Sequence, residues 1–417
     1  MPAEATLLGL ARGGGGEMAV QELRGAHLGR CMTLLRAVRE AAEASAHPEA
    51  GMAAAGWTLL AALDRSHPDA VREVLAYPTV AVWARRTLTE LARARASHPG
   101  RLACAAAVAA HRAGRDRAIQ LPAEDGAVVL PGLGRAVMRG AATARSRAGR
   151  VGDVLLEDGQ PGWAPLRSLE AGHGDARVRF VLEDVDPDRM PGAATVTGRL
   201  DDHTVERWRD VLAQAWDLLV TLHWTTAAEV STAITALTPL RASGNGHHSA
   251  TPLHAFGNIG LSTPPGAHEL ADSLAHEIQH TKLSALLETV VLTLPDDGTR
   301  YYAPWRPDPR PLAGLLQGAY AYLGVTGFWR RQRDAERGER ALRAHSEFAR
   351  WREAAFAATR TLAGSGRLTE EGAVFVAEMG RTLRAWRRES VPSAALRRAR
   401  AIAGEHRRSW RDRNPSR

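Results

Sequence analysis

The stretch LADSLAHEIQHTKLSALLE, residues 270–288, contains the most specific pattern in the sequence. It includes H-E-x-x-H as His276, Glu277 and His280. Because residues four apart share one face of an α-helix, both imidazoles can reach the same metal ion. Apolar residues in the stretch recur at helical spacing and can hold that helix against a core. We therefore predict a core-packed helix with a metal site at His276 and His280.

The third metal ligand is less clear from the sequence. A zinc peptidase uses the motif glutamate as general base and needs a third ligand downstream. Neither known extension is complete, because the metzincin Gly and His positions hold leucines and residues 289–329 contain no glutamate. On a straight helix Glu288 would lie roughly 12 Å beyond His280. It can join the site only if the helix ends or bends near Ser284, which would create the two-histidine, one-carboxylate triad of non-haem Fe(II) oxygenases.

A second unusual segment, RYYAPWRPDPRPLAGLLQGAYAYLGVTGFWRR, spans residues 300–331. Its first half is a proline-rich loop with Arg306 and Arg310, whose rigid backbone suits recognition of a carboxylate by a guanidinium fork. In the alternative interpretation the loop is structural and its arginines pair with Asp308 or nearby acids. The second half predicts an apolar helix. The candidate catalytic or pocket-lining residues are Glu277, Tyr302, Gln317 and Tyr322.

The remaining patterns predict an α+β protein that is predominantly helical. Short β-rich runs separated by Gly, Pro and Asp indicate a small antiparallel sheet or a set of hairpins in the middle of the chain, with helices before and after it. A short apolar run, HAFGNIGLST at 254–263, could add a strand. The expected regions are a helical N-terminal part (1–122), a mixed part (123–265), the metal-site region with the HExxH helix (266–330) and a basic helical C-terminal part (331–417), which we expect to form one compact catalytic unit.

Composition limits the class of protein. The chain has 417 residues, 45% hydrophobic and 24% charged, which is typical of a globular protein. No apolar run is long enough for a membrane span and the first residues lack the features of a signal peptide, so we expect a cytoplasmic protein without a membrane partner. The net charge is +8, but the arginines are spread along helices without interleaved aromatics, so we expect no nucleic-acid partner. Lys282 is the one lysine in the sequence.

The two motif segments together resemble a known family. HEIQHTKLSALLE followed by YYAPWRPDPRPLAGLLQGAYAYLGVTGFW is similar to the HEXXH-motif peptide-modification family of actinobacterial peptide natural-product clusters. Further landmarks are VREVLAYPTVAVWARRTL at 71–88, LEDVDPDR at 182–189 and AFGNIGLSTPP at 255–265. The resemblance extends over nearly the whole chain.

The resemblance implies an Fe(II)- and 2-oxoglutarate-dependent β-hydroxylase that acts on a ribosomally made precursor peptide. Iron would be bound by His276 and His280, and a radical-SAM maturase of the same pathway is a candidate second partner. From the chemistry of the loop, Arg306 or Arg310 would bind the distal carboxylate of 2-oxoglutarate. The chain departs from the family pattern at two positions: Ser284 stands where the family often has Gly, and Tyr322 where it often has His.

Several alternatives remain open at the level of the sequence. We take Glu288 as the third ligand, because a carboxylate needs no deprotonation near neutral pH whereas the phenol of Tyr322 does. The rival enzyme is a zinc peptidase with Glu277 as base. A non-catalytic peptide-binding protein of the same pathway is the third possibility, and the replacement at Tyr322 is its main support.

Overall fold

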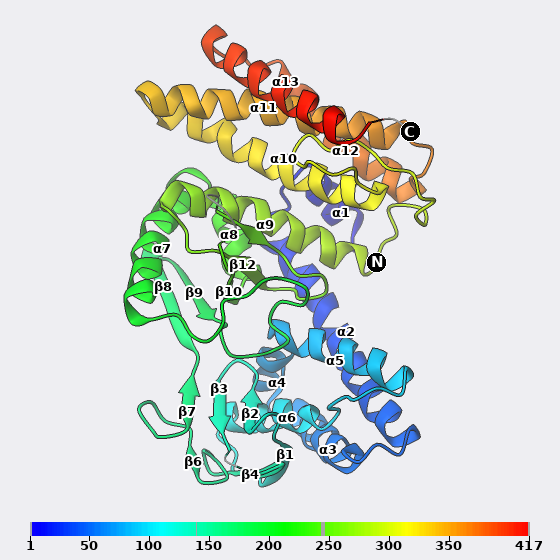
Figure 1. Cartoon of the computed structure of the whole chain (residues 1–417), viewed down its shortest axis with the longest axis vertical. Coiled ribbons are helices and arrows are strands. Elements are labelled where there is room, and N and C mark those ends of the chain that lie inside the picture. The colour runs from blue at the N-terminus through cyan, green and yellow to red at the C-terminus, as the bar shows by residue number, and fades with distance from the viewer. Residues whose placement is uncertain (1, 139, 243–246, 416–417) are drawn as a thin grey trace.

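The computed structural model describes residues 2–138, 140–242 and 247–415. Within them 13 helices account for 56% of the described residues, together with small sheets, so the prediction of a mostly helical α+β protein is confirmed. The molecule consists of two lobes, one above the other in Figure 1. Helix α2 (Gly16–Ala44) connects them: its N-terminal half carries Val20 and Leu23 into the upper core, and its C-terminal half carries Leu35 and Val38 into the lower core.

The lower lobe combines helices with two small antiparallel sheets. The sheets have the strand orders β1-β4-β5-β6 and β2-β3-β7. The helices and strands of this lobe are α3 (Ala50–Ser66), α4 (Pro68–Leu75), α5 (Pro78–Ala92), α6 (Arg101–Arg112), β1 (Ile119–Pro122), β2 (Ala127–Leu130), β3 (Gly134–Val137), β4 (Thr143–Arg147), β5 (Arg150–Val151), β6 (Val154–Leu155) and β7 (Trp163–Pro165).

The upper lobe contains the larger core and one five-stranded sheet, in the order β11-β12-β10-β9-β8. Its helices are α1 (Glu4–Ala11), α7 (Asp202–Leu222), α8 (Trp224–Ala233), α9 (Ala267–Leu287), α10 (Leu312–Ala335), α11 (Gly338–Ala363), α12 (Glu370–Arg387) and α13 (Ser393–Arg413). Its strands are β8 (Arg167–His173), β9 (Ala176–Leu182), β10 (Ala236–Pro239), β11 (Ser249–Ala250) and β12 (Asn258–Leu261).

The prediction of a small antiparallel sheet in the middle of the chain is confirmed in part, because this sheet is mixed. Strand β10 pairs in parallel with both β9 and β12. The chain leaves β9, crosses through α7 and α8, and returns as β10, and such a helical crossover makes the two strands run in the same direction. The expected strand in 254–263 is present as β12. The predicted mixed region 123–265 is divided between the two cores.

Helix α9 lies inside the upper lobe and carries the HExxH motif. It is continuous from Ala267 to Leu287, and most of its residues are buried. The face of α9 that carries Gln279 and Lys282 binds the glycine-rich turn before α2. Gln279 Nε2 donates to the carbonyl of Gly13, and Lys282 Nζ donates to that of Gly14. Both contacts fix the rotation of the helix. None of the described helices is long and apolar enough to cross a membrane.

Candidate metal centre

His276 and His280 converge as the motif predicts. Their Nε2 atoms lie 3.2 Å apart, with ring centroids separated by 4.9 Å. Two imidazole nitrogens bound to one ion at ordinary bond lengths are separated by about 3.0 to 3.4 Å in octahedral or tetrahedral geometry. Burial lowers the pKa of His276 to about 4, which keeps its imidazole neutral near pH 7. The pair therefore fits a single divalent ion.

Gln317 on α10 fixes the orientation of one of these rings. His280 Nδ1 donates a hydrogen bond to Gln317 Oε1 at 3.1 Å, and the amide nitrogen of Gln317 lies 3.4 Å from the hydroxyl of Ser284. Because the proton of His280 is then on Nδ1, the lone pair of Nε2 is available for a metal. The predicted pocket residue Gln317 thus contacts a predicted ligand directly.

The motif glutamate lies beside the histidine pair and is held by two hydroxyl groups. Ser249 and Thr251 donate to the two carboxylate oxygens of Glu277 at 2.6 and 2.7 Å. Glu277 Oε1 lies 3.9 Å from His276 Nε2, within reach of a water molecule on a bound metal. Sequence reasoning missed both hydroxyl donors, because a serine and a threonine in a loop segment have no spacing pattern that relates them to α9.

Tyr322 lies against His276, at the position where the resemblance implies a histidine. The two rings meet edge to face with centroids 5.2 Å apart. The Tyr322 ring is packed between two indoles: its centroid lies 4.8 Å from that of Trp305 and 4.2 Å from that of Trp351. A Cβ at Gly318 would lie 2.4 Å from the Trp305 indole, so only glycine permits this close packing. Burial raises the pKa of Tyr322, so the phenol stays protonated.

Glu288 is not brought to the histidines, which corrects the predicted third ligand. The bend near Ser284 that this role requires is absent, because α9 continues to Leu287. The Glu288 carboxylate instead pairs with Arg30 at 2.5 Å and Arg85 at 3.3 Å, and it accepts a hydrogen bond from His254 at 2.9 Å. In the described parts of the chain, no three His, Cys, Asp or Glu side chains form a group that could hold a metal ion. The candidate centre therefore has two convergent potential ligands.

The proline-rich loop does not extend its predicted residues toward the histidine pair. Arg306 and Arg310 both pair with Asp308, at 2.9 and 3.2 Å, as in the structural interpretation of the loop. Tyr302 faces the C-terminal helix, where its hydroxyl lies 2.9 Å from His406 Nδ1. Trp305 of this loop does reach the site, where its indole stacks on the ring of Tyr322.

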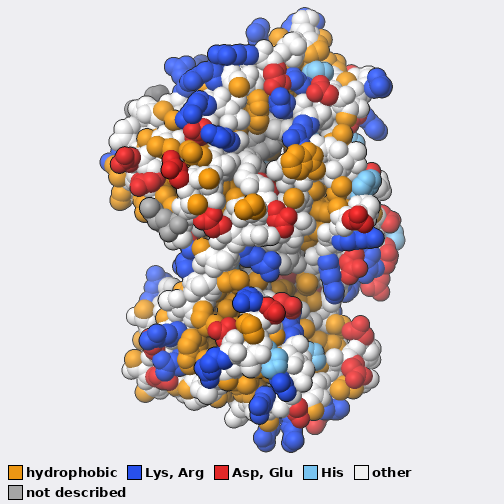
Figure 2. All heavy atoms as spheres, turned by 180° about the vertical axis from the view of Figure 1, so that it is seen from behind, with side chains coloured by type: hydrophobic (Ala, Val, Ile, Leu, Met, Phe, Trp, Pro, Cys, Tyr) orange, Lys and Arg blue, Asp and Glu red, His pale blue; other side chains and the backbone are white. Residues whose placement is uncertain are grey.

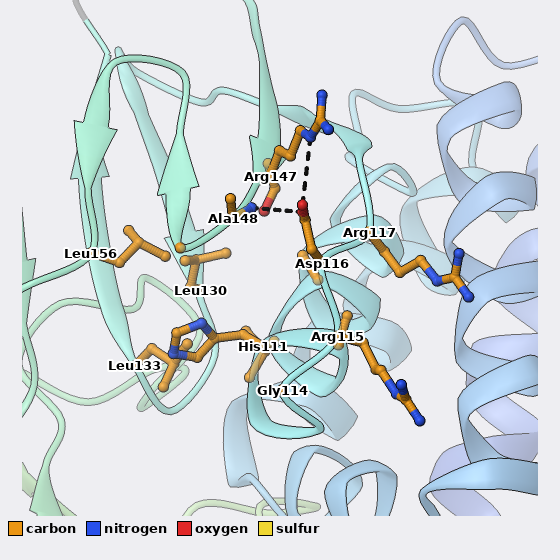
Figure 3. A pocket seen from close by; sticks show the side chains of 15 residues that line it. His111, Gly114, Arg115, Asp116, Arg117, Leu130, Leu133, Arg147, Ala148 and Leu156 are labelled. Carbon is orange, nitrogen blue, oxygen red and sulfur yellow. Dashed lines mark hydrogen bonds and ion pairs between the residues drawn. The ribbon is translucent and has the colours of Figure 1, made fainter.

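A separate cavity of about 340 Å³ lies in the lower lobe, between the end of α6 and the small sheets. Leu130, Leu133 and Leu156 line one side of it, and Asp116 faces Arg147 across its edge (Figure 3). None of the predicted site residues lines this cavity. The chemistry-bearing residues and this cavity are therefore in different lobes.

In comparisons with known proteins, the chain matches no protein-family model and no curated protein.

Proposed function

We propose that the protein is a metal-dependent enzyme that uses His276 and His280 to bind Fe(II) and hydroxylates a ribosomally made peptide with 2-oxoglutarate. The observation that carries the metal site is the 3.2 Å separation of the two Nε2 atoms. The His280–Gln317 hydrogen bond supports it, because it leaves the coordinating nitrogen unprotonated. The resemblance to peptide hydroxylases supplies the substrate class and the cosubstrate.

The residues present fit a metal better than they fit 2-oxoglutarate. Iron bound at the two imidazoles would supply the oxidative chemistry. Tyr322, stacked on Trp305, packs against the His276 ring and would help to exclude water from it. The arginines predicted for the cosubstrate are held by Asp308, so we assign no residue to its distal carboxylate.

Two features of the site favour functions other than peptide hydroxylation. The position of Glu277, 3.9 Å from His276 Nε2, suits the general base of a zinc peptidase. The buried phenol of Tyr322 beside His276, in place of the expected histidine, favours a peptide-binding protein without catalysis. Glu277→Gln separates the two enzymes, because base catalysis is worth roughly 10²- to 10⁴-fold.

The proposal is tested with purified protein, Fe(II) and 2-oxoglutarate, by measuring succinate and the intact mass of the co-expressed precursor peptide. We expect succinate formation, a mass increase of one oxygen atom, and loss of both in His276→Ala and His280→Ala. His268→Ala is the matched control, since His268 is on the same helix but pairs with Glu336. Peptide cleavage with zinc, abolished in Glu277→Gln, would replace the proposal with the peptidase. Peptide binding without metal uptake would leave only the binding protein.

A further inference from the structure

Four arginines lie along one exposed face of α13, in two pairs separated by a gap at Gly404. Arg397, Arg400, Arg408 and Arg411 are all exposed. Their spacing places them within an arc of about 80° around the helix, over a length of about 21 Å. The opposite face of α13, with Ala395 and Ala399, is buried against the rest of the lobe. We call these four residues the arginine stripe.

The arginine stripe carries more charge than Glu405 and Asp412, the two acidic residues beside it on α13, can neutralise. Among the described residues, none of its four members forms an ion pair, whereas the neighbouring Arg398 pairs with Glu339 at 2.7 Å. Residues 331–417 contain 21 arginines and 11 acidic residues, a net charge of +10, while the whole chain carries +8. The rest of the chain is therefore slightly acidic, and the positive charge is concentrated at the end formed by α10 to α13. Arginines are frequent at that upper end in Figure 2.

Helix α13 is also connected to the candidate metal centre. His406 and Trp410, on its inner side, contact Tyr302, and the Arg407 guanidinium lies 4.3 Å from the centre of the Tyr302 ring. Three residues further on, Trp305 stacks on Tyr322, which contacts His276. The loop segment from Tyr302 to Trp305 thus contacts α13 at one end and the aromatic neighbour of His276 at the other.

We propose that the arginine stripe is a docking surface for an acidic segment of the peptide substrate, an inference that rests on the proposed function for the identity of that partner. Guanidinium groups bind carboxylates through paired hydrogen bonds, and a row of four matches a row of glutamate or aspartate side chains. An acidic peptide fits better than a single-stranded nucleic acid, because no aromatic side chain is exposed along the stripe to stack on bases and Trp410 is packed against Tyr302. Attraction of this kind increases the association rate and weakens with salt.

The test measures the anisotropy of a fluorescein-labelled, glutamate-rich peptide titrated with the full-length protein at low and raised salt. We expect the peptide to bind, its glutamine counterpart not to bind, and Arg400→Glu/Arg408→Glu to weaken binding at least 10-fold. The matched control is Arg65→Glu/Arg117→Glu, two exposed arginines of the lower lobe, which changes the net charge equally and should leave binding unaltered. Circular dichroism establishes that both variants are folded.

Three outcomes would overturn the docking surface. These are equal loss of binding in the stripe and control variants, no loss in the stripe variant, and tighter binding of a labelled DNA duplex than of the glutamate-rich peptide. The proposed function is judged separately, because His276→Ala should lose succinate formation and retain peptide binding. A protein that binds the acidic peptide through the stripe without forming succinate would support docking and contradict the hydroxylase.

Discussion

His280 Nδ1 and Gln317 Oε1, from two different helices, are joined by a hydrogen bond of 3.1 Å. This contact is the clearest sign that α10 takes part in the centre, because it selects the tautomer of a candidate ligand. A metal-binding imidazole generally needs such a partner on its second nitrogen, which raises its basicity and fixes its plane. The arrangement explains why one polar amide is present in an otherwise apolar part of α10.

Removing this acceptor should weaken metal binding. We expect Gln317→Leu to raise the Kd for one divalent ion about 10- to 100-fold without unfolding the protein. Gln317→Glu keeps an oxygen acceptor and should retain the affinity. Competition with a chromogenic chelator measures both values. Equal affinities of the wild type and Gln317→Leu would show that the amide does not act through His280.

We expect Glu288 to contribute to the unfolding free energy and not to metal binding. We expect Glu288→Gln to bind the metal normally and to lower the unfolding free energy by about 2 to 3 kcal/mol, because Arg30 and Arg85 lose their carboxylate partner. Glu269→Gln, in the first turn of α9, is the control; its ion pair with Arg343 is about half exposed and should be worth less than about 1 kcal/mol. Urea titration gives both differences. Loss of the metal in Glu288→Gln would restore the ligand role that the sequence suggested.

Lys282 and Glu229 form a fully buried ion pair of 2.7 Å. The other oxygen of Glu229 accepts a hydrogen bond from the backbone of Gly16. Breaking such a pair from one side leaves an uncompensated charge, so Lys282→Met should cost about 3 to 5 kcal/mol in unfolding free energy. Lys282→Met/Glu229→Gln should recover most of that loss, because the amide still accepts from Gly16. A single variant as stable as the wild type would mean that water reaches Glu229.

Local sequence patterns determine one part of this site, and tertiary contacts determine the rest. The convergence of His276 and His280 follows from helical periodicity alone, and could therefore be predicted. The position of the Glu288 carboxylate is set by ion pairs with Arg30 and Arg85, which come from helices more than 200 residues earlier in the chain. No local pattern indicates such partners, so the carboxylate was assigned to the metal. Ser249 and Thr251 were missed for the same reason, since their contact with Glu277 exists only after β11 packs beside α9.

The buried side chain of His223 should make the unfolding free energy depend on pH. Its ring stacks on Phe328 with centroids 4.3 Å apart, and its Nε2 donates to Gln332 at 3.1 Å. Burial lowers its pKa from 6.5 to about 4, against the smaller opposing effect of the Gln332 hydrogen bond. The unfolded chain therefore takes up the proton first as the pH falls, so the histidine's contribution decreases from pH 6.5 down to about pH 4 and then levels off.

Replacing His223 should make the unfolding free energy depend less steeply on pH. Between pH 7 and pH 4 the wild type should lose about 3 kcal/mol more unfolding free energy than His223→Gln, which keeps a donor for Gln332 but does not titrate. The other buried histidines contribute equally to both proteins, so the difference between the two urea-denaturation series isolates His223. Parallel curves would show that water reaches the ring and that its pKa in the folded protein is the ordinary one.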